Sequence, residues 1–257
     1  MKHIIVCVKI VPVGNDVTVD SEYHMERNRV SHQLNIADMA AVEAALRWQP
    51  DADVTVLTMG PQKAEEILQD LLNRGVNRAI LLTDRKMAGA DSYATAVVLK
   101  AAIQKLETFD LILCGRKTVD GETGQVPGEL SAALHIPCIT NVSSIECIEN
   151  KIHCDRLLEN GIEVLETELP AIISMCEYSY PLRLPSIRMR RLASGKKVER
   201  WSLDELELSD TFTGQAGSKT KVLKATHLET GLRKGPRETD INKGIEALRM
   251  ILKEKQS

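Results

Sequence analysis

The sequence contains few aromatic residues: phenylalanine, tryptophan and tyrosine together make up 3% of its 257 residues. Proteins that bind single-stranded nucleic acid stack bases on such rings. The chain also has no basic excess, since 33 lysines and arginines stand against 36 aspartates and glutamates and leave a net charge of −3. General nucleic-acid binders usually have a strong basic excess. We therefore expect no nucleic-acid partner.

Long apolar runs are also missing. No stretch approaches the roughly 18 to 20 apolar residues that a membrane-spanning helix needs. The start of the chain, MKHIIVCVKIVPVG, has only a short apolar core and no small-residue cleavage pattern. It predicts a first buried strand and not a signal peptide. We therefore expect a cytoplasmic protein without a membrane span.

The six cysteines and six histidines are dispersed, and no Cys-x-x-Cys pair occurs. This spacing indicates no metal site, and free thiols in a reducing compartment explain the cysteines. The one alternative is that Cys147 and Cys154 face each other across a hairpin. No serine, histidine and aspartate stand in a recognisable catalytic order. The sequence thus predicts neither a metal ligand nor a catalytic side chain.

What the sequence does contain is an alternation of apolar runs and amphipathic segments. Such alternation is typical of a parallel sheet with helices on both faces. We therefore predict an α/β fold with three layers, α/β/α, around a mostly parallel sheet. Strands are expected at residues 3–8, 53–58, 78–83, 109–114 and 170–176, and helices near 39–46, 60–75, 91–106 and 131–134.

The pattern changes in the second half of the chain. The pairs Glu149-Asn150 and Asn160-Gly161 are turn signals between β-prone runs, and they predict an antiparallel β ribbon. Further on, the apolar runs become too short for an independent core. We therefore predict two parts, an α/β domain at 1–182 and an extended C-terminal arm at 183–257.

The stretch CGRKTVDGETGQVPGEL, from Cys114 to Leu130, separates a predicted strand from a predicted helix. It is longer than a plain strand-to-helix connection, which needs only a few residues. Its glycines and the helix opening that follows favour a bound phosphate, because exposed main-chain amides point at the anion. The stretch matches neither the P-loop nor the dinucleotide fingerprint. An anion-binding loop and a long surface loop therefore fit it equally well.

A second stretch, TDRKMAGADSYATA at 83–96, also leads from a strand through a glycine to a helix opening. Asp91, Ser92 and Thr95 place three oxygen-bearing side chains on the first helical turn, where they could contact a ligand. A capped helix start explains Asp91 and Ser92 equally well without any ligand.

Taken in order, four segments resemble the β subunit of electron transfer flavoproteins over nearly the whole chain. They are VCVKIVP, LNIADMAAVEAALRW with Asn35 and Asp38, TMGPQKAEEILQDLLNRGVNRAILLTDR, and the loop that begins at Cys114. The resemblance implies a nucleotide-binding α/β domain with a C-terminal arm that embraces an α subunit. The chain departs from the family pattern where Ile36-Ala37 replaces Pro-Tyr, where Met87 replaces an aromatic residue, and where Val126-Pro127-Gly128 inverts Gly-Pro.

The β subunit of that family binds an adenine nucleotide, which is structural AMP in one branch and a second FAD in the electron-bifurcating branch. In the bifurcating branch this FAD takes hydride from NADH. The loop has Arg116 where the AMP branch tends to have lysine, and the stretch at 83–96 is similar to a motif of the bifurcating branch. We therefore favour FAD in this subunit, with AMP as the alternative. The residues that match the motif are Asp84, Arg85, Gly89, Asp91, Ala94 and Thr95.

The resemblance also implies which residues form the cofactor site. Main-chain amides of the loop would hold the phosphates, and a second helix opening would contact the remainder of an FAD. Leu184 would dock on a partner dehydrogenase. The implied cofactor-binding residues are Cys7, Asn35, Asp38 and Met59 at the adenosine end, Asp91, Ala94 and Thr95 at the second opening, and Gly115, Arg116, Lys117, Thr118, Val119, Asp120, Gly121, Glu122, Thr123, Gly124, Gln125 and Val126 in the loop.

The function implied by the resemblance is electron transfer as a heterodimer with an α subunit. NADH would pass a hydride to the β-bound FAD, and the two electrons would split between the α-subunit FAD and a low-potential acceptor, ferredoxin or flavodoxin. The partner enzyme would be an acyl-CoA-type or other flavin dehydrogenase. Two alternatives stay open: a β subunit with structural AMP that serves one α-bound FAD, and a small nucleotide-binding sensor that is stable alone. The polar stretch 183–235 argues against the sensor.

Overall fold

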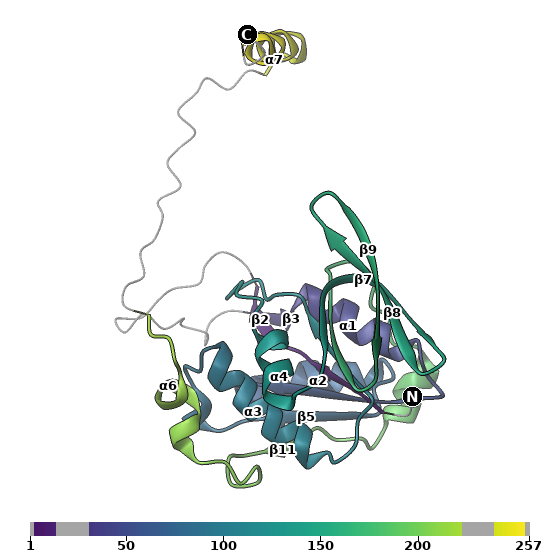
Figure 1. The fold of residues 1–257 in the computed structure, drawn as a ribbon, viewed down its shortest axis with the longest axis vertical. Coiled ribbons are helices and arrows are strands. Elements are labelled where there is room, and N and C mark those ends of the chain that lie inside the picture. The colour runs from purple at the N-terminus through teal and green to yellow at the C-terminus, as the bar shows by residue number, and fades with distance from the viewer. Residues whose placement is uncertain (1–2, 14–30, 223–238, 255–257) are drawn as a thin grey trace. The chain divides into compact units, whose positions relative to one another are not determined.

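A computed structural model describes residues 3–13, 31–222 and 239–254 of the chain. The chain divides into two compact units, residues 1–223 and 224–257. The first unit is an α/β domain, and the second contains the helix α7 (Ile241–Glu254) (Figure 1). Helix α7 is amphipathic, and its large apolar side chains Ile241, Leu248 and Met250 are exposed. No helix among the described residues is both long and apolar enough to cross a membrane.

A nine-stranded sheet forms the middle layer of the first unit. The strands are parallel except for an antiparallel ribbon at one end, as the sequence predicts. In spatial order they are β11 (Glu199–Trp201), β5 (Arg78–Leu82), β4 (Asp53–Met59), β1 (His3–Cys7), β6 (Leu111–Gly115), β10 (Ala171–Met175), β7 (Cys138–Ile148), β8 (Lys151–Leu158) and β9 (Gly161–Glu168).

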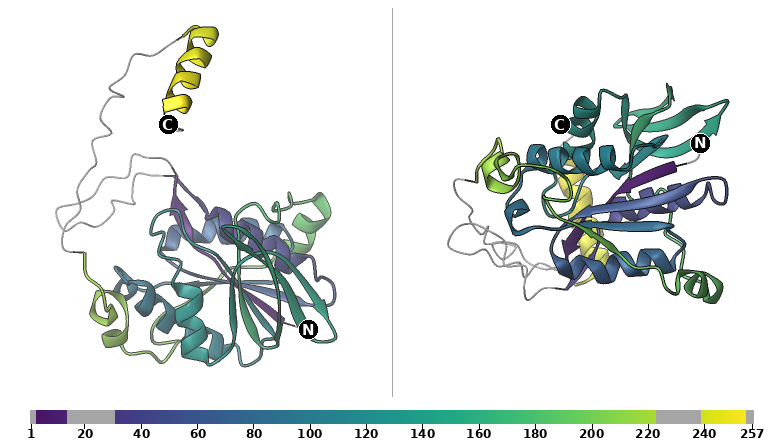
Figure 2. Two further views of the ribbon diagram at one scale, coloured as in Figure 1. Left: turned by 45° about the horizontal axis from the view of Figure 1, so that its top comes forward. Right: turned by 90° about the horizontal axis from the view of Figure 1, so that it is seen from below.

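Helices cover both faces of this sheet, which confirms the predicted three-layer arrangement (Figure 2). Ile4 and Ile5 show how one strand serves both layers, because neighbouring side chains of a strand point to opposite faces. Ile4 packs in the core under α1 (Ile36–Leu46) and α2 (Glu65–Asn73). Ile5 packs in the core under α3 (Ser92–Lys105) and α4 (Val126–Leu134). The central strands β6 and β10 are almost entirely apolar because both of their faces are buried.

Several elements were not predicted from the sequence. Strands β2 (Ile10–Pro12) and β3 (His32–Leu34) form a separate antiparallel pair, and β11 extends the main sheet. Each of these strands has only three residues, which is too short for a readable hydrophobic period. Helix α4 begins at Val126, five residues before the predicted start at Ser131, with Pro127 in its first turn.

Residues 183–222 belong to the first unit and contribute short helices and β11 to it. Helix α5 (Ile187–Ala193) packs against α2, while η4 (Asp210–Phe212) and α6 (Gly214–Gly217) follow β11, with α6 against α3. The part of the expected arm at 223–238 lies outside the described residues. That the arm docks on a partner stays a prediction.

The register of the ribbon decides how its two cysteines lie. Cys154 pairs with Ile145, and Cys147 pairs with Ile152. The two cysteines are therefore diagonal neighbours, and the alternative in which they face each other across the hairpin is wrong. Both are free thiols.

Candidate functional site

The carboxyl ends of β1 and β6 form the place where the strand order of the sheet reverses. The chain passes from β1 to β4 and β5 on one side, and β6 lies on the other side of β1. In open α/β sheets, ligands bind in the crevice at such a point. Cys7 ends β1 and Gly115 ends β6, and α1 begins at Ile36 beside them. The structure thus brings together the predicted loop and the predicted adenosine-end residues of β1 and α1.

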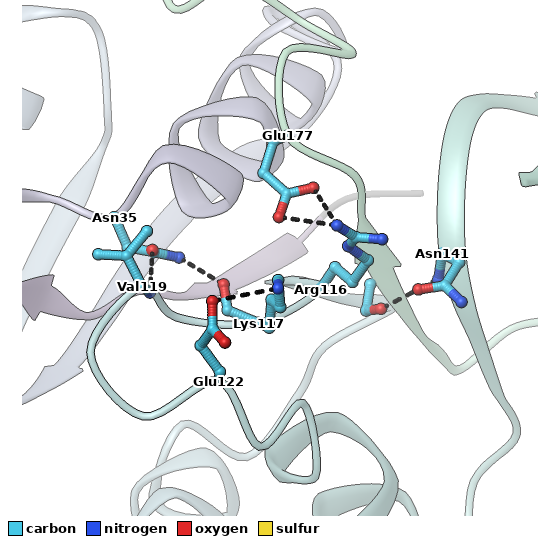
Figure 3. Close-up of polar contacts among 8 residues, drawn as sticks. Asn35, Arg116, Lys117, Val119, Glu122, Asn141 and Glu177 are labelled. Atoms are coloured by element: carbon cyan, nitrogen blue, oxygen red, sulfur yellow. Dashed lines mark hydrogen bonds and ion pairs between the residues drawn. The ribbon is translucent and has the colours of Figure 1, made fainter. Parts of the chain in front are cut away.

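Asn35 joins the loop to the start of α1. Its side chain is fully buried. Its Nδ2 donates to the Lys117 carbonyl at 2.9 Å, and its Oδ1 accepts from the Val119 amide at 3.3 Å (Figure 3). Both ends of the buried amide are therefore satisfied by the main chain of the loop, as buried polar groups require. The predicted site residue Asn35 holds the loop in shape.

Asp38 is a buried carboxyl group below the loop. Its Oδ2 accepts from the main-chain amide of Lys9 at 2.7 Å. Burial raises the pKa of Asp38 to about 7, although hydrogen bonds from the Lys9 main chain, the Asn35 side chain and the Gly115 main chain lower it. A Cβ on Gly115 would lie 2.0 Å from Oδ1 of Asp38, so only glycine fits at this position.

Lys9 is a residue of this site that the sequence did not reveal. Its Nζ lies 2.7 Å from Oδ1 of Asp120, whose side chain is 3% exposed, while the Lys9 side chain is 37% exposed. The ion pair ties the middle of the loop to the end of β1. The two residues are 111 positions apart, so no local motif could have indicated the pair.

The loop presents free main-chain N–H groups at the start of α4. Within the described part of the chain, the amides of Gly121, Thr123, Gly124, Gln125 and Val126 donate no hydrogen bond. The loop bends at Gly124, where φ is +62° and a Cβ would lie 3.2 Å from a carbonyl oxygen. Free amides at a helix N-terminus, with its positive dipole end, form an anion site.

The charged side chains of the loop are mostly paired within the chain. Arg116 lies 2.9 Å from Glu177, and Lys117 lies 3.3 Å from Glu122 (Figure 3). The amides, and not free cations, are therefore the groups that the loop offers to an anion. No group of histidine, cysteine, aspartate and glutamate side chains among the described residues could hold a metal ion.

The second predicted helix opening lies beside the first. Asp91 caps α3, because its Oδ1 accepts from the Ala94 amide at 2.9 Å. The Ser92 hydroxyl lies 3.0 Å from both Gln125 Oε1 and Glu129 Oε1, and thereby links α3 to the start of α4. Ser92 was considered as a possible ligand contact from the residues alone but was not among the cofactor-binding residues implied by the resemblance, and Glu129 was not predicted at all.

The remaining predicted residues lie at different distances from this crevice. Met59 ends β4 and is half-buried at the same edge of the sheet. Cys7 on β1 lies opposite Cys114 in the register of the neighbouring strand β6. A hydrogen bond to Cys7, together with burial, raises the pKa of the Cys114 thiol. Leu184 lies elsewhere, on the connection to α5, and is 82% exposed.

Comparisons with known proteins identify the family of the chain. A family model described as "Electron transfer flavoprotein domain" matches residues 23–206. The electron transfer flavoprotein subunit beta of Thermoanaerobacterium thermosaccharolyticum is 38% identical over 225 residues, which cover 86% of each chain. The caffeyl-CoA reductase-Etf complex subunit CarD of Acetobacterium woodii is 35% identical over 227 residues, which cover 87% of each chain.

A further relative, protein FixA of Azorhizobium caulinodans, is 36% identical over 235 residues, which cover 86% of this chain and 82% of that protein. The family match includes every strand of the main sheet except β1, together with the loop and both helix openings. This chain therefore belongs to the electron transfer flavoprotein family, as a β subunit.

Proposed function

We propose that this chain is the FAD-binding β subunit of an electron-bifurcating electron transfer flavoprotein. The observation that carries the proposal is the set of unbonded amides at Gly121 and from Thr123 to Val126, at the start of α4. A dinucleotide has two phosphates to place, and a second helix opening, at α3, lies next to the first. Two adjoining openings suit a ligand that extends beyond one phosphate, such as FAD, better than they suit AMP.

In this proposal, different residues of the crevice contact different parts of the cofactor. Cys7, Asn35, Asp38 and Met59 flank the adenosine end, and loop residues 115–126 hold phosphate through their main chain. The opening of α3, with Asp91, Ala94 and Thr95, lies against the part of the ligand beyond the phosphates. FAD, when bound, accepts hydride from NADH and passes on single electrons. The protein contributes position and local charge, and we assign no acid or base to it.

The partners follow from the same proposal. An α subunit completes the heterodimer, and the exposed Leu184 docks on a dehydrogenase. One relative is named as a subunit of a caffeyl-CoA reductase-Etf complex, which supports a flavin dehydrogenase that acts on an acyl-CoA thioester. Ferredoxin or flavodoxin is the low-potential acceptor in this scheme.

A β subunit with structural AMP is the second candidate. It is favoured by one observation: the Asp91 carboxylate is already occupied by hydrogen bonds within the chain. The α3 opening could then be a capped helix start, and the loop alone would hold a single phosphate.

Flavin counting separates the two candidates. The chain would be co-expressed with its α subunit, and FAD and AMP would be counted in the purified heterodimer. Our proposal predicts two FAD and no AMP per heterodimer, together with bleaching of flavin absorbance on titration with NADH. One FAD and one AMP, with no response to NADH, would establish the AMP-binding candidate.

A further inference from the structure

The segment after α6 is fastened to the loop that precedes α3. The Thr213 hydroxyl lies 3.3 Å from the Lys86 carbonyl. Ser218 Oγ accepts from the Asp91 amide at 2.9 Å and donates to the Gly214 carbonyl at 2.7 Å. Residues 218–220, which we call the strap, therefore lie across the opening of α3. The sequence of the strap, SKT, gives no local reason for this position.

Asp91 is the centre of this attachment. Its Oδ2 accepts from the amides of Lys219 and Thr220 at 2.8 Å each and from the Thr220 hydroxyl at 3.0 Å. Its Oδ1 accepts from Ala94. An N-cap needs only one such oxygen. The second oxygen is used for the strap, so this carboxylate is saturated by protein donors.

The next residue continues the connection toward the nucleotide loop. Ser92 follows Asp91 directly, and its hydroxyl lies 3.0 Å from Gln125 Oε1 and Glu129 Oε1. Gln125 is the N-cap of α4, beside the free amides. Polar contacts thus run from Thr220 through Asp91 and Ser92 to Gln125. Any shift of the α3 opening moves the hydroxyl that contacts the loop.

We propose that Asp91 is a positioning residue which, by holding the strap across the α3 opening, fixes Ser92 against the nucleotide-binding loop. Asp91 acts on the ligand through Ser92 and the loop, and it does not need to touch the ligand. The inference rests on the proposed function, in which the loop binds a nucleotide. The inference makes the strap part of the site, although the strap lies about 95 positions after the loop in the sequence.

The test compares Asp91→Asn with the matched variant Asp110→Asn in the heterodimer. Asp91→Asn keeps the size of the side chain and one acceptor oxygen, but its amide nitrogen cannot accept from the three donors that contact Oδ2. Asp110 also accepts from a main-chain amide, that of His3 at 2.9 Å, but it precedes β6 at the end of the strand away from the crevice. We expect Asp91→Asn to weaken FAD binding to the flavin-depleted heterodimer about tenfold, and Asp110→Asn to change it less than twofold. Equal affinity of Asp91→Asn and wild type would overturn the inference.

A double variant separates positioning from a general loss of structure. If Asp91 acts through Ser92, the effects of Asp91→Asn and Ser92→Ala on FAD affinity must not add. Full additivity would overturn the inference. Should Asp91→Asn fail to fold, Thr220→Val removes one donor only, and it must also weaken binding.

Hydrogen exchange in the nucleotide-free protein tests the inference independently of the proposed function. Asp91→Asn should speed exchange at the Thr220 amide and also at the amides of Val119 and Glu122, which are hydrogen-bonded in the loop. Faster exchange in the strap without any change in the loop would overturn it. Wild-type protein that bound neither FAD nor AMP would refute the proposed function instead.

Discussion

The Lys9 amide donates to the buried carboxyl group of Asp38 across 2.7 Å, at the point where the sheet reverses its strand order. This contact joins the end of β1 to the first turn of α1. On the other side of Asp38, Gly115 leaves no room for a side chain. The base of the nucleotide crevice is thus a closely packed polar contact between three segments that are distant in the sequence.

The first prediction concerns the pH dependence of stability. The pKa of Asp38 in the folded chain is about 7, above its ordinary value of 3.8. The folded state therefore binds this proton more tightly than the unfolded state, so the contribution of Asp38 to stability falls as pH rises from about 4 to about 7. Relative to wild type, Asp38→Asn should gain free energy of unfolding over this range, by at most about 4 kcal/mol. Urea unfolding at several pH values measures the difference; parallel pH profiles would contradict the account.

The second prediction concerns the glycine that ends β6. In Gly115→Ala the new Cβ would meet Oδ1 of Asp38 at 2.0 Å. We expect a loss of about 1–3 kcal/mol in stability from overpacking, together with loss of nucleotide binding. Gly161→Ala is the control, since a Cβ there meets nothing within 4 Å. Thermal unfolding and FAD titration of both variants test the prediction, and normal FAD binding by Gly115→Ala would refute it.

The third prediction concerns the hold of Asn35 on the loop. Asn35→Ala leaves the Lys117 carbonyl and the Val119 amide without their buried partner. We expect a loss of about 1–3 kcal/mol in stability and weaker nucleotide binding. The exposed Asn160, in the turn of the ribbon, gives the control variant Asn160→Ala, for which we expect less than about 0.5 kcal/mol. Similar losses in the two variants, measured by urea unfolding, would show that Asn35 has no special role.

The fourth prediction compares two ion pairs of equal length and different burial. Lys9–Asp120 and Lys151–Glu166 both measure 2.7 Å, but the side chains of the first are 37% and 3% exposed and those of the second 42% and 53%. A double-mutant cycle with Lys9→Met and Asp120→Asn should give a coupling energy of about 1–3 kcal/mol. The cycle for the exposed pair should give less than about 1 kcal/mol. Equal coupling energies would mean that burial of Asp120 does not strengthen its bond to Lys9.

The long periodic elements could be predicted from the sequence because each depends on its own residues. Strands β1 and β6 are short apolar runs and β4 is rich in β-branched residues. Asp91 was predicted as the cap of α3, which the structure confirms. Residues 115–126 were predicted to bind a nucleotide through the resemblance, which stays a prediction; five amides among them donate no hydrogen bond within the described part of the chain.

The parts that could not be predicted depend on contacts between distant segments. Lys9 meets Asp120 across 111 positions, and Asp91 meets Thr220 across 129 positions. Neither pair leaves a periodic or local signal in the sequence. Strand β11 has three residues and exists because β5 offers it a free edge. Contacts between segments that are distant in the sequence therefore determine these two ion and hydrogen-bond contacts and the presence of β11.

The central claim is that main-chain amides of the loop at the start of α4 bind the diphosphate of FAD, while the adjoining α3 opening contacts the rest of the cofactor. The most direct measurement is a crystal structure of the heterodimer grown with excess FAD. The account predicts phosphate oxygens within hydrogen-bonding distance of the amides between Gly121 and Val126, with the rest of the FAD beside the α3 opening. An empty crevice, or one filled by AMP alone while FAD is abundant, would contradict it.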